Sequence, residues 1–269
     1  MLSAGGRVSG ERRPASLPRA LIVDDDRDVL RGFARNLKNR ISVSLLVLVV
    51  TALSGLATGV AQAQEGALPG LQAVLGELRK GGFVVYFRHA TTDHAGASDE
   101  EANLASCETQ RNLSAVGREQ ASRIGQAFRD LGIPVGTVTT SPFCRCKDTA
   151  RLAFGRFTVS DDLNFAMGAD GEERKRLAEA LRRMLSSPPG PGTNAVIVAH
   201  TANLRESAGI WPKPEGVAYL FRPRPGGELA PAAKVLPEEW AAAADRERQG
   251  ARGVVHVRRP DTPLRRSGP

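Results

Sequence analysis

Two short apolar runs that each lead into a histidine constrain the fold of this chain more than any other feature. Residues 83–87 precede Arg88 and His89, and residues 195–199 precede His200. Both runs are rich in β-branched or aromatic residues, which is typical of buried strands in a parallel sheet. Because ligands bind outside the carboxyl ends of such strands, we expect both histidines at one binding site.

Two arginines are expected to join the histidines at that edge of the sheet. Arg88 directly precedes His89, and Arg145 lies in the segment 141–150. This segment opens with Ser-Pro, and Pro142 suits the first position of a helix, so Arg145 would lie near the positive end of that helix. Guanidinium groups beside imidazoles suit a dianionic phosphoryl group, so the pattern indicates a phosphate site.

At these residues the chain resembles the histidine phosphatase superfamily (phosphoglycerate mutase-like, branch 1). The family's markers are an Arg-His pair after the first strand, a Ser-Pro-x-x-Arg-x-x-x-Thr-Ala stretch and a late strand that ends in His. All three occur here in the family's order, and the resemblance covers residues 81–221. It implies an α/β fold, a three-layer α/β/α sandwich with a mostly parallel sheet.

The resemblance also implies roles for the site residues. His89 would attack phosphorus and become phosphohistidine, while Arg88 and Arg145 would neutralise the equatorial oxygens of the phosphoryl group. His200 would donate to the same oxygens. Cationic side chains would thus do the work of a metal ion, and no cofactor is expected.

The general acid of the family is missing from the matching stretch. Many members carry a Glu after a Leu, whereas Asn164 follows Leu163 here. We take Asp93 as the candidate catalytic acid, because it lies four residues after His89, and Asp162 as a further candidate. Without an acid in position, substrates with poor leaving groups would react slowly.

We therefore expect a metal-independent phosphomonoesterase that acts on a phosphorylated small molecule or saccharide through His89. Two alternatives stay open. The first is a phosphohistidine phosphatase that acts on a protein. The second is a non-catalytic phosphate-binding module of the cell envelope, which would keep the pocket and lack the acid.

Residues 41–63 have the pattern of a secretory signal peptide, with a basic flank, an apolar run over 41–60 and an Ala-x-Ala site that ends at Ala63. Small residues in the run favour cleavage and export to the periplasm or the extracellular space. The run is also just long enough for a membrane anchor, which is the alternative. Residues 20–39 resemble the truncated start of a response-regulator receiver domain, in an extension, 1–40, that we expect to be non-functional.

The formal net charge of +8 belongs to the ends of the chain. Residues 1–40 carry +4 and residues 246–269 carry +5, so the histidine phosphatase domain expected over 67–240 is close to neutral. No basic helix with interleaved aromatic residues occurs in the sequence, and we therefore expect no nucleic-acid binding. A basic, disordered tail is expected over 241–269.

Three cysteines, Cys107, Cys144 and Cys146, fit an exported protein. Cys144 and Cys146 are too close in sequence to pair comfortably with each other, so a disulfide from Cys107 to one of them is the hypothesis. Zinc binding by three thiols and a buried unpaired thiol are the alternatives.

The remaining pattern places further elements around these motifs. Apolar spacing predicts helices that bury one face, and short apolar stretches predict strands. The expected helices cover residues 67–80, 114–131 and 172–186, and the expected strands cover 135–140 and 216–221, the last as a candidate edge strand.

Overall fold

The computed structural model describes residues 68–95, 99, 102–224, 226 and 228–256. The predicted signal segment 41–63 and the receiver-like segment 20–39 lie outside the described residues, as do residues 257–269. In the described part of the chain, none of the helices has the length and apolarity that crossing a membrane requires.

Six strands of the described residues form one mixed sheet in the order β3-β2-β4-β1-β5-β6. The strands are β1 (Val84–Arg88), β2 (Val135–Thr140), β3 (Thr158–Val159), β4 (Asn194–Ala199), β5 (Ala218–Phe221) and β6 (Pro231–Val235). The first four in this order are parallel, whereas β5 and β6 are each antiparallel to the preceding strand. The predicted mostly parallel sheet is confirmed.

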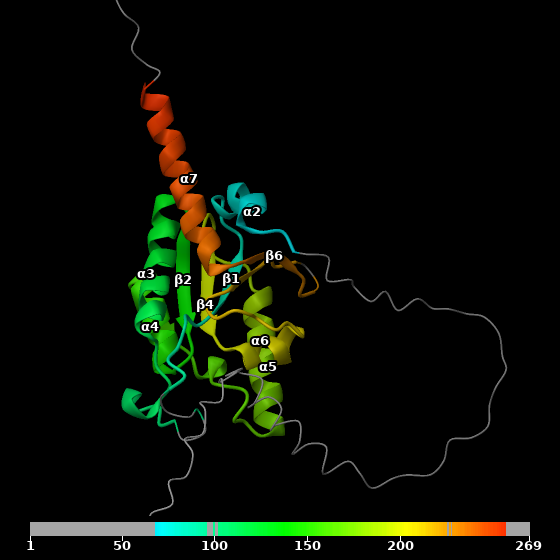
Figure 1. The fold of residues 1–269 in the computed structure, drawn as a ribbon. Helices are drawn as coiled ribbons and strands as arrows, with labels where there is room; N and C mark the ends of the chain where they lie inside the picture. The colour runs from blue at the N-terminus through cyan, green and yellow to red at the C-terminus, as the bar shows by residue number, and fades with distance from the viewer. Residues whose placement is uncertain (1–67, 96–98, 100–101, 225, 227, 257–269) are drawn as a thin grey trace, which may run out of the picture. The chain divides into compact units, whose positions relative to one another are not determined.

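Helices cover both faces of this sheet, as Figure 1 shows. One face packs against α2 (Leu71–Leu78), α3 (Ala115–Asp130), α4 (Cys144–Phe154) and α7 (Pro237–His256). The other packs against α5 (Gly171–Ser186) and α6 (Thr201–Ala208). The three-layer architecture predicted from the sequence is therefore confirmed.

Aromatic rings fill the core between β1, α3 and α7. The ring of Trp240 lies 4.7 Å from that of Phe128 and 5.9 Å from that of Phe87, measured between centroids. Such tilted pairs stabilise a core beyond the area that they bury. Alternate residues of β1 face the opposite side of the sheet, where Tyr86 packs with Leu181 of α5. Both faces of this strand are thus buried, as its continuous apolar run predicts.

The register of the parallel strands brings the expected site residues to one edge. Arg88 of β1 pairs with Ala199 of β4, and Thr140 of β2 pairs with Val198 of β4. The carboxyl ends of these three strands are therefore level. The segments that follow β1, β2 and β4 therefore all start at the same end of the sheet, and these segments carry the motif residues.

The predicted helices differ from the observed ones mainly at their ends. Ser114 caps α3 as expected, because its Oγ accepts a hydrogen bond from Gly117 N at 3.1 Å. The helix expected to start at Pro142 begins two residues later, at Cys144, and Arg145 still lies in its first turn.

The prediction of an edge strand over 216–221 was wrong in one respect. β5 lies inside the sheet, between β1 and β6. The sequence analysis missed β6, because Pro231 and the small residues Ala232 and Ala233 give no strong strand pattern.

The structure also corrects the expected disordered tail from residue 241. α7 continues to His256, and its residues Trp240, Ala243 and Ala244 are buried in the core with α3. Alanines at helical spacing are good helix formers but weak signals of burial, so this packing could not be predicted from the local pattern.

Candidate active site

The two histidines lie side by side because adjacent parallel strands end at the same level. His89 follows β1 and His200 follows β4, and His89 N donates to Ala199 O at 3.0 Å. Their ring centroids are 5.6 Å apart. Both residues are almost fully buried, with 2% and 1% of their surface exposed, respectively.

The tautomer of His89 follows from its contact with a carbonyl oxygen. His89 Nδ1 lies 3.0 Å from Ala90 O. A carbonyl oxygen accepts but does not donate, so Nδ1 carries the proton and Nε2 keeps its lone pair. Burial lowers the pKa of His89 well below its usual 6.5, and Arg145 and Arg88 lower it further. The imidazole is therefore neutral and keeps a lone pair on Nε2, which is the state that nucleophilic attack requires.

Arg145 is fully buried in the first turn of α4 and contacts the second histidine. Its Nη2 donates to His200 Nδ1 at 3.2 Å. Thr149 fixes this turn, because its hydroxyl donates to Arg145 O at 2.7 Å and accepts from Ala90 N at 3.0 Å. One threonine thus ties the segment after β1 to the helix that carries the second arginine.

Both ring nitrogens of His200 contact protein groups. Nδ1 accepts from Arg145, so the proton of the neutral ring is on Nε2, which lies 2.8 Å from Ser141 Oγ. Burial and, next, the charge of Arg145 lower the pKa of His200 well below 6.5. His200 holds Arg145 through Nδ1. Its expected donation to a phosphate stays a prediction.

Glu215, which the sequence analysis did not select, holds the first arginine. Arg88 Nη2 donates to Glu215 Oε1 at 3.2 Å. The backbone N and the hydroxyl of Thr92 each donate to this carboxylate at 2.9 Å. Oε1 also lies 3.9 Å from His89 Nδ1. The carboxylate therefore positions Arg88 next to His89.

Glu215 reaches the site because β5 runs antiparallel to β1. The residues just before β5 consequently meet the carboxyl end of β1, where Gly216 N donates to His89 O at 2.8 Å. Gly216 has φ of 82°, a conformation that glycine adopts without strain. The Pro-x-Pro-Glu-Gly stretch before β5 could have indicated Glu215 as a site residue. That inference required knowing that β5 pairs with β1.

A third guanidinium, that of Arg111, lies at the same site. Its Nη1 lies 3.0 Å from Thr92 Oγ1, 3.2 Å from His94 Nδ1 and 3.6 Å from Glu215 Oε1. Its Nη2 donates to Asp99 Oδ2 at 3.2 Å. The charge of Arg111 contributes to the lowered pKa of both site histidines, which places it within electrostatic reach of them.

Neither acid chosen from the sequence joins this group. Asp93 is exposed, and its Oδ1 accepts from Ala95 N at 2.9 Å, which closes a local turn. Asp162 forms an ion pair with Arg176 of α5. We selected Asp93 because it is close to His89 along the chain. In the structure, the local turn holds its carboxylate against the backbone N of Ala95.

Asp99 is the carboxylate that the structure brings to the arginines. Its Oδ1 lies 2.7 Å from Arg145 Nη1, and its Oδ2 lies 3.3 Å from Arg145 Nη2 and 3.2 Å from Arg111 Nη2. Its side chain is 10% exposed. One carboxylate therefore bridges two guanidinium groups within the site.

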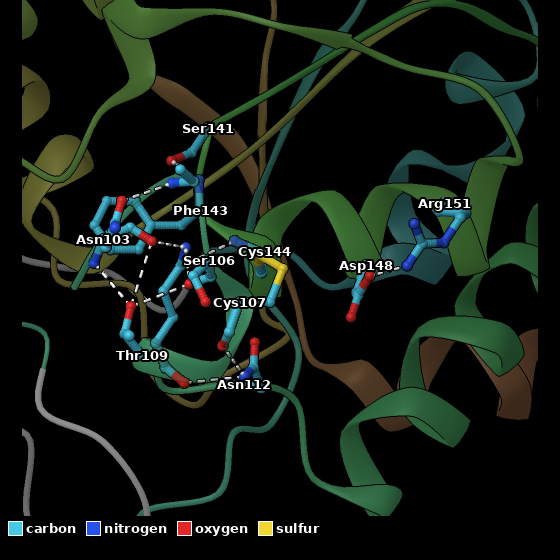
Figure 2. The surroundings of a disulfide bond; sticks show 12 residues. Asn103, Ser106, Cys107, Thr109, Asn112, Ser141, Phe143, Cys144, Asp148 and Arg151 are labelled. Atoms are coloured by element: carbon cyan, nitrogen blue, oxygen red, sulfur yellow. Dashed lines mark hydrogen bonds and ion pairs between the residues drawn. A yellow bond between two sulfur atoms is a disulfide. The ribbon is translucent and has the colours of Figure 1, made fainter.

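A disulfide bond ties the loop that carries Arg111 to the start of α4. Cys107 pairs with Cys144, one of the two pairings expected from the sequence, and Figure 2 shows this bond with the loop residues around it. Cys144 N also donates to Gln110 Oε1 at 2.8 Å. Covalent and hydrogen bonds thus connect the neighbours of Arg111 and Arg145.

Cys146 is the buried unpaired thiol among the alternatives considered. Burial raises its pKa to about 12, and its Sγ lies 3.7 Å from His200 Nε2. A thiol with such a pKa stays protonated and is a poor nucleophile. Because two of the three cysteines form the disulfide, the three-thiol zinc site is excluded. In the described residues, no group of three or more His, Cys, Asp or Glu is placed to hold a metal ion.

A comparison with protein families agrees with the site. Residues 84–164 match the family model "Histidine phosphatase superfamily (branch 1)". This segment belongs to the histidine phosphatase superfamily. It runs from β1 through α4 and contains Arg88, His89 and Arg145. The family predicted from the sequence is confirmed, and membership of this superfamily indicates a phosphatase.

Solved structures that resemble this chain include three phosphatases. The protein histidine phosphatase SixA complexed with tungstate is 15% identical, with a TM-score of 0.42 over 58% of this chain and 98% of that chain. A putative α-ribazole-5′-P phosphatase from Escherichia coli is 14% identical, with a TM-score of 0.45 over 58% of this chain and 97% of that chain. A phosphoserine phosphatase from Entamoeba histolytica in complex with 3-phosphoglyceric acid is 15% identical, with a TM-score of 0.40 over 56% of this chain and 95% of that chain. No curated protein matches the chain.

Proposed function

We propose that this protein is a metal-independent phosphomonoesterase that works through a phosphohistidine on His89. One observation carries the proposal. A buried, neutral imidazole with its Nε2 lone pair available lies beside the guanidinium groups of Arg88 and Arg145. Nucleophile and charge-neutralising groups thus lie together, as phosphoryl transfer requires.

The charges of the site match a phosphate monoester. Arg88, Arg111 and Arg145 supply three positive charges, and Glu215 is held among two of them as a fixed anion. Apart from Asp99, the site therefore has an excess of two positive charges. A phosphoryl group with two negative charges would neutralise that excess, which is the role that a metal ion has in other phosphatases.

The reaction would proceed in two displacements. The Nε2 lone pair of His89 attacks phosphorus, the phosphorus–oxygen bond to the leaving group breaks, and the leaving oxygen takes its electron pair and a proton from solvent. Water then attacks the phosphohistidine, the phosphorus–nitrogen bond breaks, and inorganic phosphate leaves. The hydrogen bond from Nδ1 to Ala90 O keeps the ring oriented and stabilises the positive charge that it gains in the first step.

We also propose that the protein acts outside the cytoplasm. Two observations support this location, namely the signal-like segment 41–63 and the Cys107–Cys144 disulfide. Structural disulfides persist in oxidising compartments and are rare in the cytosol. Cell fractionation followed by thiol labelling tests the proposal, and a reduced protein confined to the cytoplasmic fraction would contradict it.

The experiment for the activity is hydrolysis of an aryl phosphate in the presence of a chelator, for the wild type and for His89→Gln. Turnover that survives the chelator and vanishes in the variant supports the proposal. Denaturing the wild type during turnover of a labelled substrate should also trap an acid-labile, base-stable phosphoenzyme. A folded wild type without turnover, or a variant with wild-type turnover, would overturn the proposal.

A further inference from the structure

Asp99 binds the arginines of the site with the geometry that a phosphate group would use. Its two carboxylate oxygens lie 2.7 Å and 3.3 Å from the Nη atoms of Arg145. Two parallel contacts of this kind are how a guanidinium binds either a carboxylate or a phosphate. Arg111 Nη2 completes the arrangement at 3.2 Å from Asp99 Oδ2.

The contacted donors are those that the proposed reaction needs. Arg145 Nη2 faces both Asp99 and His200, so the carboxylate lies at the same guanidinium edge as the site histidine. A phosphoryl oxygen and the carboxylate of Asp99 cannot occupy these donor positions together. Binding of a substrate at Arg145 therefore requires that Asp99 give up its contacts.

We propose that Asp99 is an internal ligand of the pocket, which a substrate phosphoryl group must displace, and that this competition sets the affinity and selectivity of the site for anions. The inference rests on the phosphate pocket of the proposed function. It adds a specificity-determining residue that the sequence motifs do not include.

Charge explains the selectivity that such a ligand would confer. An anion with one negative charge offers the arginines no more than Asp99 already supplies, and Asp99 is held nearby by the chain. A dianion neutralises the two excess positive charges that remain when Asp99 leaves. The apparent dissociation constant of any anion is its intrinsic value divided by the fraction of protein in which Asp99 is displaced. Every anion loses affinity by this same factor, so a singly charged anion, which binds the free arginines more weakly than a dianion does, falls below detectable binding first.

Glu215 does not play the same part, although it is also an anion of the site. Both of its oxygens accept hydrogen bonds from Thr92, and Arg88 binds it at 3.2 Å. It is held by neutral donors as well as by arginines. Among the described residues, the hydrogen-bond donors to the carboxylate of Asp99 are instead the guanidinium groups of Arg111 and Arg145, to which a stronger anion would bind.

The test compares Asp99→Asn with Asp93→Asn. Both remove one negative charge from the same loop, but Asp93 is exposed and accepts from Ala95 N. Titration calorimetry with inorganic phosphate at constant ionic strength should show that Asp99→Asn binds at least about tenfold more tightly than the wild type. Asp93→Asn should bind as the wild type does.

Steady-state kinetics with an aryl phosphate provides the second measurement. Asp99→Asn should lower KM, because displacement of the carboxylate precedes the chemical step. Unchanged or weaker phosphate binding in Asp99→Asn would overturn the inference. So would an unchanged affinity with a kcat loss larger for alkyl than for aryl phosphates, because that pattern belongs to a proton donor. If Asp99→Asn does not fold, Asp99→Ser takes its place.

The two proposals fail separately. Phosphate binding requires no turnover, so the comparison is repeated in a His89→Gln background. Tighter binding in the double variant His89→Gln/Asp99→Asn supports the internal ligand even if no substrate is hydrolysed. Hydrolysis through His89 with no effect of Asp99→Asn on phosphate binding overturns the internal ligand and leaves the phosphatase proposal intact.

Discussion

The guanidinium group of Arg145 donates to Nδ1 of His200 at 3.2 Å, so the two motif residues form one unit. Because that nitrogen accepts, His200 is neutral and its proton faces Ser141 Oγ. The backbone of the histidine is fixed too, since Tyr86 Oη donates to His200 O at 2.6 Å. In the proposed reaction, His200 would therefore act through the arginine that it positions.

Replacing His200 separates this positioning role from direct phosphate contact. His200→Ala removes the acceptor for Arg145 and should lower kcat/KM for an aryl phosphate by about 10². His200→Gln offers an amide oxygen that accepts from Arg145 and should recover at least about tenfold of that loss. Equal losses in the two variants would contradict positioning through the acceptor.

The fork geometry of Arg145 should matter more than its charge. Arg145→Lys keeps the charge but cannot make two parallel hydrogen bonds, so kcat/KM should fall by about 10². Arg151→Lys is the matched control, because Arg151 lies on the same helix, α4, and pairs with Asp148 away from the histidines. Steady-state kinetics on the two variants would count against the bidentate role if both lost activity alike.

Buried neutral histidines should make stability depend on pH. The pKa of both His89 and His200 is lowered in the folded protein, mainly by burial. As the pH falls below 6.5, the unfolded chain takes up protons that the folded chain does not, so the free energy of unfolding decreases. The decrease approaches about 1.4 kcal/mol per pH unit for each histidine until the pH reaches the folded-state pKa.

Urea unfolding of the wild type and of His200→Gln between pH 7.5 and pH 5 measures this dependence. The variant lacks one buried histidine and should show a shallower loss of stability. The acid limb of kcat/KM should likewise lie below pH 6.5, because His89 stays neutral there. Parallel stability curves for the two proteins would show that His200 is not the group being protonated.

Local pattern predicted the parts of the site that lie on single elements. The apolar runs identified β1 and β4, and parallel pairing of neighbouring strands then placed His89 and His200 together. The three-layer fold was what the resemblance to the histidine phosphatase superfamily implied. Arg88 and Arg145 followed because each lies directly on a strand end or a helix start.

The carboxylates of the site depend on long-range pairing, which local pattern does not encode. Glu215 reaches Arg88 because β5 pairs with β1 in antiparallel fashion, and the sequence analysis left the neighbours of that strand open. Asp99 lies in a long polar loop with several acids, and nothing local distinguishes it from Asp93. Contact with two buried arginines is what distinguishes it in the structure.

Reduction of the disulfide should affect both stability and activity. Cys107 and Cys144 are separated by 37 residues, and closing a loop of that length stabilises the folded state by about 4 kcal/mol in the chain-entropy model. The bond also joins the segment that carries Arg111 to the helix that carries Arg145, so its loss should raise KM. Dithiothreitol should therefore lower both Tm and kcat/KM of the wild type.

The variant Cys107→Ser provides the control for this prediction. It should have the lowered Tm without any reductant, and dithiothreitol should change it no further. Cys146 keeps its thiol in both proteins and is buried, with a pKa of about 12, so it should not react during the assay. Mass spectrometry checks that dithiothreitol has reduced both Cys107 and Cys144 in the wild type. If Tm and KM are nevertheless unchanged, the prediction is wrong, and the hydrogen bond from Cys144 N to Gln110 holds the loop without the covalent bond.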